Sequence, residues 1–341
     1  MTTDEKRMRR ALDLARLGEG LTRPNPPVGA LLALDGETIA EGRHRRAGTD
    51  HAERDCLKKV APEVDLRSAT LYVTLEPCST HGRTPPCVEL ILERGVGRVV
   101  VAVEDPNPKH AGRGLERLRA GGVEVVVGVC AEAGRELIAP FAKFVATGMP
   151  FLTLKLAVTL DGKIADRSGV SKWITGAAAR ERVQAMRRRA DAIMVGAGTV
   201  RADDPSLLPR PAEGRTPWRV IVGRDVPSAA IVLTDEASER TLVRSGDLPT
   251  LLRELAGERD AMHVLCEGGG KLAAALTKAS LVDEYVFFVA PKLMGADGVP
   301  CFAKRGGAMD DLERLRFVGL EQLGEDVLLR AVPAGWRHEE K

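Results

Sequence analysis

The sequence has little of what nucleic-acid-binding and membrane proteins need. Aromatic residues make up 4% of its 341 residues, which leaves little material for a platform on which bases could stack. The 50 basic and 48 acidic side chains nearly cancel to a formal net charge of +2, so no global charge attracts nucleic acid. No apolar run approaches the length of a membrane span, and residues 1–10 lack the hydrophobic core of a secretion signal.

Cysteine is also sparse, and no repeat or low-complexity segment is present. The six cysteines are spread along the chain, so we expect no disulfide framework and a reducing cytoplasmic location. An apolar content of 44% is ample for buried cores, and the length suggests two domains. The breaker residues at 147–150 predict a first domain of residues 1–146 and a second of residues 147–341.

The stretch from His51 to Cys87 has the residue types of a catalytic zinc site. His51 and Glu53 open a helical run that we expect Asp50 to cap, and eight residues separate Cys78 from Cys87. One imidazole and two thiolates suit Zn²⁺ and leave a fourth position for water, whose pKa the metal lowers. Glu53 would then move protons between that water and a leaving amine, as in zinc deaminases.

Two plainer interpretations of this stretch stay open. The three residues could form a structural zinc site, or the cysteines could be unpaired thiols near a helix. Both interpretations leave Glu53 without a role. The prolines at 85 and 86 predict a helix that starts at Cys87, whose N-terminal dipole would help to keep that thiolate ionised.

The long interval between the cysteines is informative because simple cytidine deaminases and tRNA adenosine deaminases keep theirs close together. The segment 76–87, together with 24–26, 28–29 and 105–108, resembles the N-terminal domain of the bifunctional riboflavin-biosynthesis deaminase/reductase family. Two positions depart from the family pattern. Pro27 replaces a usual Asn and Ala30 a frequent Cys, which puts one polar substrate contact in doubt.

The resemblance and the loop positions together indicate five residues that contact the deaminase substrate: Asn25, His44, His81, Arg83 and Asn107. Asn25 can donate to and accept from a pyrimidine edge, and the fork of Arg83 suits a ribose phosphate. The alternatives are a turn-stabilising Asn25, a surface His44, a solvated Arg83 and a loop-forming Asn107.

Strands and helices alternate along both halves of the chain. Strands are predicted at 28–34, 38–42, 98–103 and 123–127, and helices at 4–18, 111–120 and 131–145. The second half adds strands from 151, at 191–196 and at 264–266, followed by a helix at 271–278. Glycines 268–270 at that last turn could cradle a phosphate, although the turn is a weak signal and differs from G-x-G-x-x-G.

In their order, these pieces resemble the dihydrofolate-reductase-like half of the same enzyme family, which binds NADPH. The resemblance therefore implies a cytidine-deaminase-like three-layer α/β/α domain followed by a dihydrofolate-reductase-like α/β domain. It places cofactor contacts at Ala157, Trp173, Thr199, Asp203, Gly268, Gly269, Gly270, Lys271 and Leu272. Substrate contacts of the reductase fall on Ser171, Arg187, Leu207, Arg210 and Glu267.

Some of these assignments have alternatives. Arg187 could lie on an exposed basic helix face, and Trp173 could be a core residue. Asp161 and Glu267 are the visible candidates for an acid or base in the reductase, so positioning could dominate its catalysis. The residues that bind the adenosine end of the cofactor cannot be located, and the preference for NADPH comes from the resemblance.

We expect a homo-oligomeric enzyme, a dimer or tetramer, for two riboflavin-pathway steps on a pyrimidine ribosyl-phosphate. A zinc-dependent deamination would precede an NADPH-dependent reduction of the ribosyl group. The alternatives are a deaminase of a related pyrimidine nucleotide with an inactive reductase domain, a nucleic-acid-editing protein and a nucleotide sensor. Charge balance and few aromatics count against nucleic acid, and Glu53 has no role in a sensor.

Overall fold

The computed structural model describes residues 1–81, 85–108, 110–212, 214–303, 308–309 and 312–335. The chain divides into two units, Met1–Gly148 and Met149–Lys341. The predicted boundary between residues 146 and 147 lies slightly earlier, inside the last turn of a helix that ends at Thr147.

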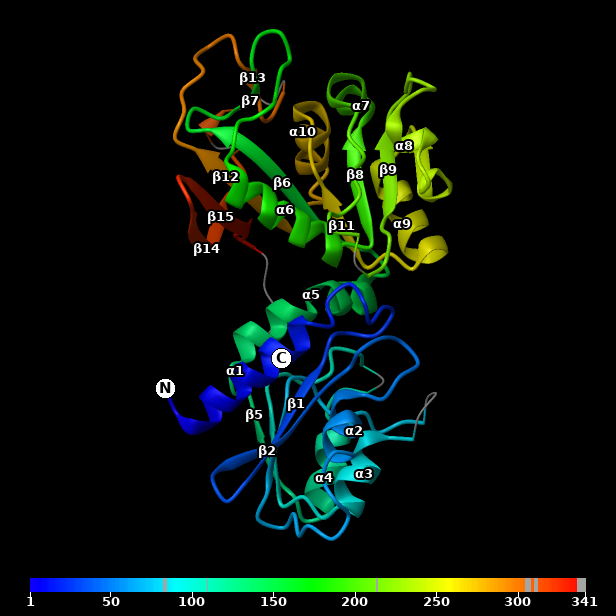
Figure 1. Cartoon of the computed structure of the whole chain (residues 1–341), viewed down its shortest axis with the longest axis vertical. Helices are drawn as coiled ribbons and strands as arrows, with labels where there is room; N and C mark the ends of the chain where they lie inside the picture. The colour runs from blue at the N-terminus through cyan, green and yellow to red at the C-terminus, as the bar shows by residue number, and fades with distance from the viewer. Residues whose placement is uncertain (82–84, 109, 213, 304–307, 310–311, 336–341) are drawn as a thin grey trace. The chain divides into compact units, whose positions relative to one another are not determined.

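The first unit alternates helices and strands along the chain (Figure 1). Its elements are α1 (Thr3–Arg16), β1 (Gly29–Leu34), β2 (Glu37–Arg43), α2 (Ala52–Leu57), β3 (Thr70–Val73), α3 (Cys87–Glu93), β4 (Arg98–Val101), α4 (Arg113–Ala120), β5 (Glu124–Val127) and α5 (Ala131–Thr147). The predicted hairpin is confirmed, because Asp35 and Gly36 join β1 to β2 with φ values of 49° and 86°.

The five strands of this unit form one sheet in the order β2-β1-β3-β4-β5. Helices α1 and α5 pack on one face through Met8, Leu12 and Leu137, and α2, α3 and α4 cover the other. Gly42 lets α2 approach β2 closely, since a Cβ there would lie 2.2 Å from the Ala52 carbonyl oxygen. The predicted three-layer arrangement is confirmed, and it brings the start of α2 beside the ends of the central strands.

The second unit is built in the same alternating way. Its elements are β6 (Phe151–Thr159), β7 (Lys163–Ala165), α6 (Ala177–Arg189), β8 (Ala192–Gly196), α7 (Ala197–Asp203), β9 (Trp218–Val222), α8 (Ile231–Thr234), η1 (Ser238–Arg240), β10 (Thr241–Arg244), α9 (Leu248–Arg259), β11 (His263–Cys266), α10 (Gly270–Lys278), β12 (Glu284–Ala290), β13 (Val299–Pro300), β14 (Leu315–Leu323) and β15 (Asp326–Pro333). The main sheet has the order β10-β9-β8-β11-β6-β12-β15-β14.

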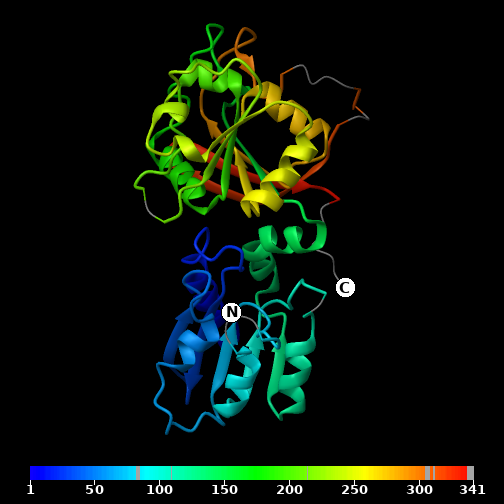
Figure 2. The same cartoon turned by 90° about the vertical axis from the view of Figure 1, so that its right-hand side faces the viewer.

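Six neighbouring strands of this sheet, β10, β9, β8, β11, β6 and β12, run parallel. Strand β15 pairs antiparallel with β12, and β14 pairs antiparallel with β15. Helices cover both faces of the parallel part (Figure 2). Helices α9 and α10 bury Leu255 and Leu276 on one face, whereas α6 packs Val183 on the other. Because parallel strands end at the same edge, their carboxyl ends form the expected place for a ligand.

The edge strand β14 carries a row of exposed apolar side chains. Phe317 and Leu320 are 72% and 77% exposed, and in the register they lie opposite Ala331 and Leu329 of β15. On the opposite face of this strand, Glu321 forms an ion pair with Arg182 of α6. One face of β14 is thus tied to a helix, while the other presents apolar surface.

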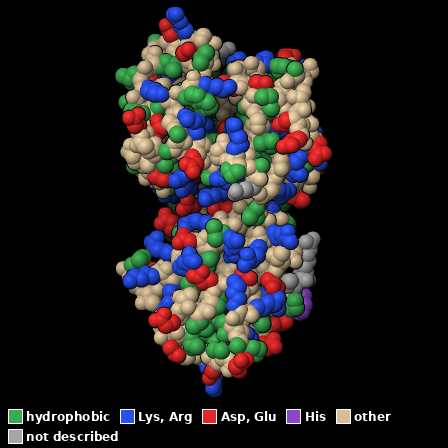
Figure 3. Space-filling model, viewed as in Figure 1, with side chains coloured by type: hydrophobic (Ala, Val, Ile, Leu, Met, Phe, Trp, Pro, Cys, Tyr) green, Lys and Arg blue, Asp and Glu red, His purple; other side chains and the backbone are tan. Residues whose placement is uncertain are grey.

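The surface charge is mixed. On the face drawn in Figure 3, Lys and Arg side chains are interspersed with Asp and Glu side chains. No helix in the described part of the chain combines the length and apolarity needed to cross a membrane.

Candidate functional site

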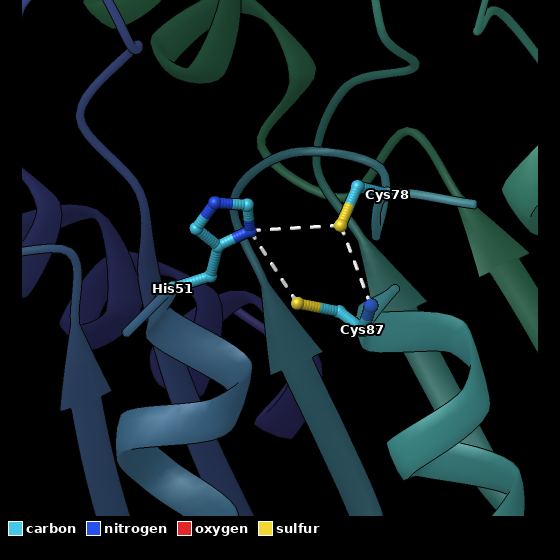
Figure 4. Close-up of side chains that lie close together, drawn as sticks. All are labelled: His51, Cys78 and Cys87. Atoms are coloured by element: carbon cyan, nitrogen blue, oxygen red, sulfur yellow. Dashed lines mark hydrogen bonds between the residues drawn. The ribbon is translucent and has the colours of Figure 1, made fainter. Parts of the chain in front are cut away.

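The three predicted metal ligands converge in the first unit. Nδ1 of His51 lies 3.5 Å from Sγ of Cys78 and 3.5 Å from Sγ of Cys87, and all three atoms face one point (Figure 4). Their mutual separations are within 4.8 Å. The interval of eight residues between the cysteines therefore closes into a single cluster.

Each ligand comes from the end of a regular element. His51 is the N-cap of α2, Cys78 follows β3, and Cys87 is the first residue of α3 after Pro86, as predicted. The expectation that Asp50 caps α2 is wrong. His51 itself occupies the cap without a side-chain hydrogen bond among the described residues, and Asp50 pairs with Lys58 at 2.6 Å.

Hydrogen bonds and burial set the ionisation of this cluster. The backbone N–H of Cys87 donates to Sγ of Cys78 at 3.3 Å. Hydrogen bonds from the Cys87 thiol and from His51 lower the pKa of Cys78, which favours the thiolate form that binds zinc.

Glu53 lies in α2, two residues after the ligand His51, and is almost fully buried. Its exposed fraction is 3%, and burial, followed by the nearby Cys78 sulfur, raises its pKa to about 7. A carboxyl group with a pKa near neutrality can both accept and donate a proton at physiological pH. This is the property that a proton shuttle requires.

The donor set fits zinc. Tetrahedral Zn²⁺ bonds of about 2.0 Å to nitrogen and about 2.3 Å to sulfur place the two donor atoms roughly 3.5 Å apart. The two N···S separations observed here match that value. The pattern of one imidazole and two sulfurs leaves a fourth position for water or substrate.

Two predicted substrate residues are coupled to each other beside this cluster. His44 is buried, and its Nδ1 lies 3.0 Å from the carbonyl oxygen of Asp50, so Nδ1 carries the hydrogen. Nε2 of the same ring lies 3.1 Å from Nδ2 of Asn25 and accepts its hydrogen. The surface alternative for His44 is wrong, since its ring also contacts the ring of His51 edge-on at 5.4 Å.

The other predicted substrate residues of the deaminase are less tightly defined. His81 is exposed, and Arg83 lies outside the described residues. Asn107 is half-buried, with its backbone N–H bonded to Asp105 at 2.8 Å. The structure therefore brings Asn25 and His44 together, and it leaves the predicted phosphate contact of Arg83 as a prediction.

In the second unit, Glu267 and Arg187 form a buried ion pair. Nη2 of Arg187 lies 2.9 Å from Oε2 of Glu267, and their side chains are 11% and 9% exposed. Burial opposes ionisation of Glu267, but Arg187 and then Lys155 outweigh it and lower its pKa. The exposed-face alternative for Arg187 is wrong, and its fork is already occupied by a carboxylate.

Lys155 is a candidate substrate-binding residue of the second unit that the sequence did not indicate. It lies in the middle of β6, with Nζ 4.0 Å from Oε2 of Glu267 and only 13% of its side chain exposed. Burial lowers its pKa, and Glu267 counteracts this effect. The available signal was a lysine inside the apolar run 151–158, on the same strand face as the predicted contact Ala157.

The predicted cofactor residues gather near the carboxyl ends of β8 and β11. Gly268 and Gly269 have φ values of 90° and 94°, and a Cβ on Gly269 would lie 2.9 Å from Oγ1 of Thr199. Gly270 starts α10, and Lys271 is exposed. Leu272 packs its side chain in the core, so its backbone is the part that could contact a ligand.

The segment around Trp173 is held near the same place. Oγ of Ser171 donates to Asp203 at 2.8 Å, and Nζ of Lys292 donates to the carbonyl oxygens of Trp173 and Ile174 at 3.2 and 2.7 Å. Trp173 is 66% exposed, with the guanidinium of Arg180 4.6 Å from its ring centre. The core alternative for Trp173 is therefore wrong.

The three remaining predicted residues differ in where their side chains lie. Arg210 is exposed, and its backbone N–H donates to Gln184 at 2.8 Å. Leu207 is 2% exposed, with φ of 60°, so its side chain belongs to the core. Asp161 accepts the N–H groups of Met294 and Gly295, and its bond from Thr159 lowers its pKa to about 2, which indicates a turn-forming role.

Comparisons with known proteins cover both units. Residues 1–103 match the cytidine and deoxycytidylate deaminase zinc-binding region, and residues 150–329 match the RibD C-terminal domain. The riboflavin biosynthesis protein RibD of Bacillus amyloliquefaciens is 40% identical, over 97% of this chain and 96% of its own. The Escherichia coli (strain K12) protein of that name is 39% identical, over 97% and 100%.

Solved structures agree. A diaminohydroxyphosphoribosylaminopyrimidine deaminase/5-amino-6-(5-phosphoribosylamino)uracil reductase from Thermotoga maritima is 39% identical, with a TM-score of 0.88 over 97% of this chain and 99% of that one. Acinetobacter baumannii RibD has a TM-score of 0.87 at 37% identity, with the same coverage. The predicted fold classes of both domains are thereby confirmed.

Proposed function

Because the chain belongs to the RibD family of bifunctional riboflavin-biosynthesis deaminases and reductases, we propose a specific reaction for each of its units. The first removes the 2-amino group of 2,5-diamino-6-(5-phosphoribosylamino)pyrimidin-4(3H)-one with water, giving 5-amino-6-(5-phosphoribosylamino)uracil and ammonia. The second reduces the ribosyl group of that product to a ribityl chain with NADPH. The convergence of His51, Cys78 and Cys87 beside buried Glu53 carries the proposal.

In the deaminase unit, His51, Cys78 and Cys87 would hold zinc. Zinc bound there would supply Lewis acidity that brings the pKa of a water molecule toward neutrality. Glu53 takes a proton from the attacking water and returns it to the departing amino nitrogen, so each turnover consumes one water and releases one ammonia. Its raised pKa suits both halves of this transfer.

Asn25 and His44 would orient the pyrimidine. Since His44 accepts a hydrogen from Nδ2 of Asn25, the amide of Asn25 has a fixed orientation. Its Oδ1 is then the group offered to a hydrogen-bond donor of the substrate. Arg83 binding the ribose phosphate, with His81 and Asn107 lining the pocket, completes the assignment.

In the reductase unit, the cofactor would lie along the carboxyl ends of the parallel strands. The turn at Gly268 and Gly269 permits close approach of a pyrophosphate, and exposed Trp173 offers a ring face near Asp203. A cavity of about 150 Å³ at the ends of β9 and β10, lined by Arg244, Ser245 and other residues, is our location for the adenosine end.

The reductase substrate would bind beside the buried cluster of Lys155, Arg187 and Glu267. Since Arg187 is engaged by Glu267, we assign the substrate phosphate chiefly to the exposed guanidinium of Arg210. The Lys155 ammonium, which lies 4.0 Å from the Glu267 carboxylate, would orient a substrate oxygen. Arg187 would hold Glu267 in place for a substrate hydroxyl.

We also propose that the chain forms a homo-oligomer through the apolar row of β14. Phe317 and Leu320 lie on one face of this strand and are 72% and 77% exposed. The same face of a second copy, packed against this one, would cover both side chains. A Leu320→Asp protein of lower mass than the wild type in sedimentation would support this interface; an unchanged mass would contradict it.

The experiment that tests the function uses the whole chain. Purified protein is incubated with the diaminopyrimidine phosphate, with and without NADPH, and the products are identified by mass. The deaminated uracil should accumulate without NADPH, and the ribityl product should form with it. A Glu53→Gln protein should still reduce supplied deaminated intermediate at near the wild-type rate; failure to do so would replace the two-site proposal with a composite site.

A further inference from the structure

Glu76, two residues before the metal ligand Cys78, has a buried carboxylate that receives three backbone N–H groups. Glu76 is 6% exposed. Oε1 accepts from Gly114 at 2.8 Å, while Oε2 accepts from Asp105 at 3.1 Å and from Gly112 at 3.0 Å. These donors lie 29 to 38 residues further along the chain.

The two bonds of Oε2 close the segment 105–112. Asp105 and Gly112 lie at its two ends, Asn107 lies within it, and Lys109 is outside the described residues. Within the segment, the N–H groups of His110 and Ala111 donate to the carbonyl oxygen of Asn107 at 2.8 and 2.9 Å. One oxygen atom of Glu76 therefore fixes both ends of the turn that displays Asn107.

The same carboxylate joins the metal-ligand loop to α4. Gly112, the N-cap of α4, has no side chain of its own to cap the helix, and Glu76 supplies the missing acceptors. A Cβ on Gly114 would lie 2.2 Å from the carbonyl oxygen of Pro77, so the contact is close. On the other side, Nη1 of Arg117 donates to the carbonyl oxygen of Ser79 at 3.0 Å.

We propose that Glu76 is a positioning residue that sets the Asn107 turn against the Cys78 loop, so that the deaminase substrate meets the turn and the metal ligand in one fixed arrangement. This inference rests on the proposed deaminase function and on the contact of Asn107 with substrate. Glu76 touches no reacting atom, so its effect is on substrate binding more than on the chemical step.

Glu76→Gln is the near-isosteric test. A carboxamide has a single acceptor oxygen, so its NH₂ must face at least one backbone N–H that now donates to Glu76. We expect KM for the diaminopyrimidine phosphate to rise about tenfold, with kcat within about twofold and zinc content unchanged, as for a loss of binding alone. Glu76→Ala, which removes all three acceptors, should raise KM further.

A double mutant separates positioning from general support of the fold. If Glu76 acts through the turn, Glu76→Gln and Asn107→Ala should raise KM singly, and together no more than the larger single effect. An unchanged zinc content and deaminase kcat in the same proteins report that the first unit is folded. Glu116→Gln, which removes an exposed carboxylate from the first turn of α4, is the matched control and should leave KM unchanged.

An unchanged KM in Glu76→Gln, additive effects in the double mutant, loss of zinc, or an equal rise in Glu116→Gln would each overturn the proposal. The positioning role of Glu76 and the substrate contact of Asn107 can fail separately. A silent Asn107→Ala with a raised KM in Glu76→Gln removes the Asn107 contact and keeps the positioning role, now exerted through other atoms of the turn. A raised KM in Asn107→Ala with a silent Glu76→Gln removes the positioning role alone.

Discussion

Oε2 of Glu267 lies 2.9 Å from Nη2 of Arg187, which joins the end of β11 to helix α6 through a buried ion pair. Lys155 is the second cation beside that carboxylate. Two positive groups thus share one negative group in the interior of the reductase unit. Removing the carboxylate would leave both cations without their counter-charge.

Glu267→Gln should therefore weaken both stability and reduction. Loss of one partner from a buried ion pair destabilises by about 3–5 kcal/mol. We expect a lower unfolding midpoint of the reductase unit in urea and a lower reductase kcat/KM, with deamination unaffected. A Lys155→Met/Glu267→Gln protein should recover part of the stability and none of the activity; full recovery of activity would contradict the assigned roles.

Cys78→Ser and Cys87→Ser should each lose zinc and deamination while retaining reduction. The physical reason is that a hydroxyl replaces one of only three protein ligands. Metal analysis should find about one zinc per chain in the wild type. Cys130→Ala, at a half-buried cysteine outside the cluster, is the control and should keep both. Full zinc and full activity in both serine variants would show that the metal site is misassigned.

Glu53→Gln should keep zinc and lose deamination by at least about a hundredfold, the lower range for general acid–base catalysis. The amide has nearly the shape of the carboxyl group but cannot carry the proton. Rate and metal content are measured on the same preparation. Loss of the metal would instead place Glu53 among the ligands.

Trp173→Ala should raise KM for NADPH at least about fivefold, equivalent to the roughly 1 kcal/mol of an aromatic contact. Because the side chain is 66% exposed, the free energy of unfolding should change by less than about 0.5 kcal/mol. Steady-state kinetics and urea unfolding measure the two quantities. A large loss of stability with an unchanged KM would indicate a packing role.

Arg219 and Asp235 provide a pH-dependent test of stability. Arg219 is 0% exposed and donates to Asp235 at 2.6 and 2.7 Å, and this bonding lowers the pKa of Asp235 below 3.8. A lowered folded-state pKa means that the contribution is present above about pH 4 and is lost as pH falls through the folded pKa. Asp235→Ala should destabilise by about 3 kcal/mol at pH 7. Urea unfolding should show this difference from wild type shrinking below about pH 4; a constant difference would contradict it.

Local sequence pattern predicted much of the fold and the metal site. The prolines before Cys87 fix the start of α3, and the Asp35-Gly36 pair fixes the hairpin, because both act through their own backbone geometry. His51, Cys78 and Cys87 could be grouped because one imidazole and two thiols beside a glutamate are the donor set and proton carrier of a zinc deaminase. The boundaries of most of the elements predicted above differ by one to three residues from the predictions, whereas β9, β10, α9 and the strands after α10 were not predicted.

What the sequence could not supply are contacts between distant segments. In the sequence, Lys155 is an ordinary strand residue, and only the pairing of β6 with β11 brings it close to Glu267. The backbone donors to Glu76 likewise come from a turn much later in the chain. For Arg187, which is predicted to contact the reductase substrate, the sequence shows the charge but not the partner, Glu267. Asp50 is not the cap because the helix begins one residue later than predicted, so that His51 is the N-cap and Asp50 pairs with Lys58.

The turn at Gly268 and Gly269 also limits how this enzyme can be redesigned. Both residues adopt φ values near 90°, and Thr199 fills the space that a side chain on Gly269 would need. Neither position can therefore accept a new side chain without strain. A change of coenzyme preference must therefore come from substitutions that leave this turn intact.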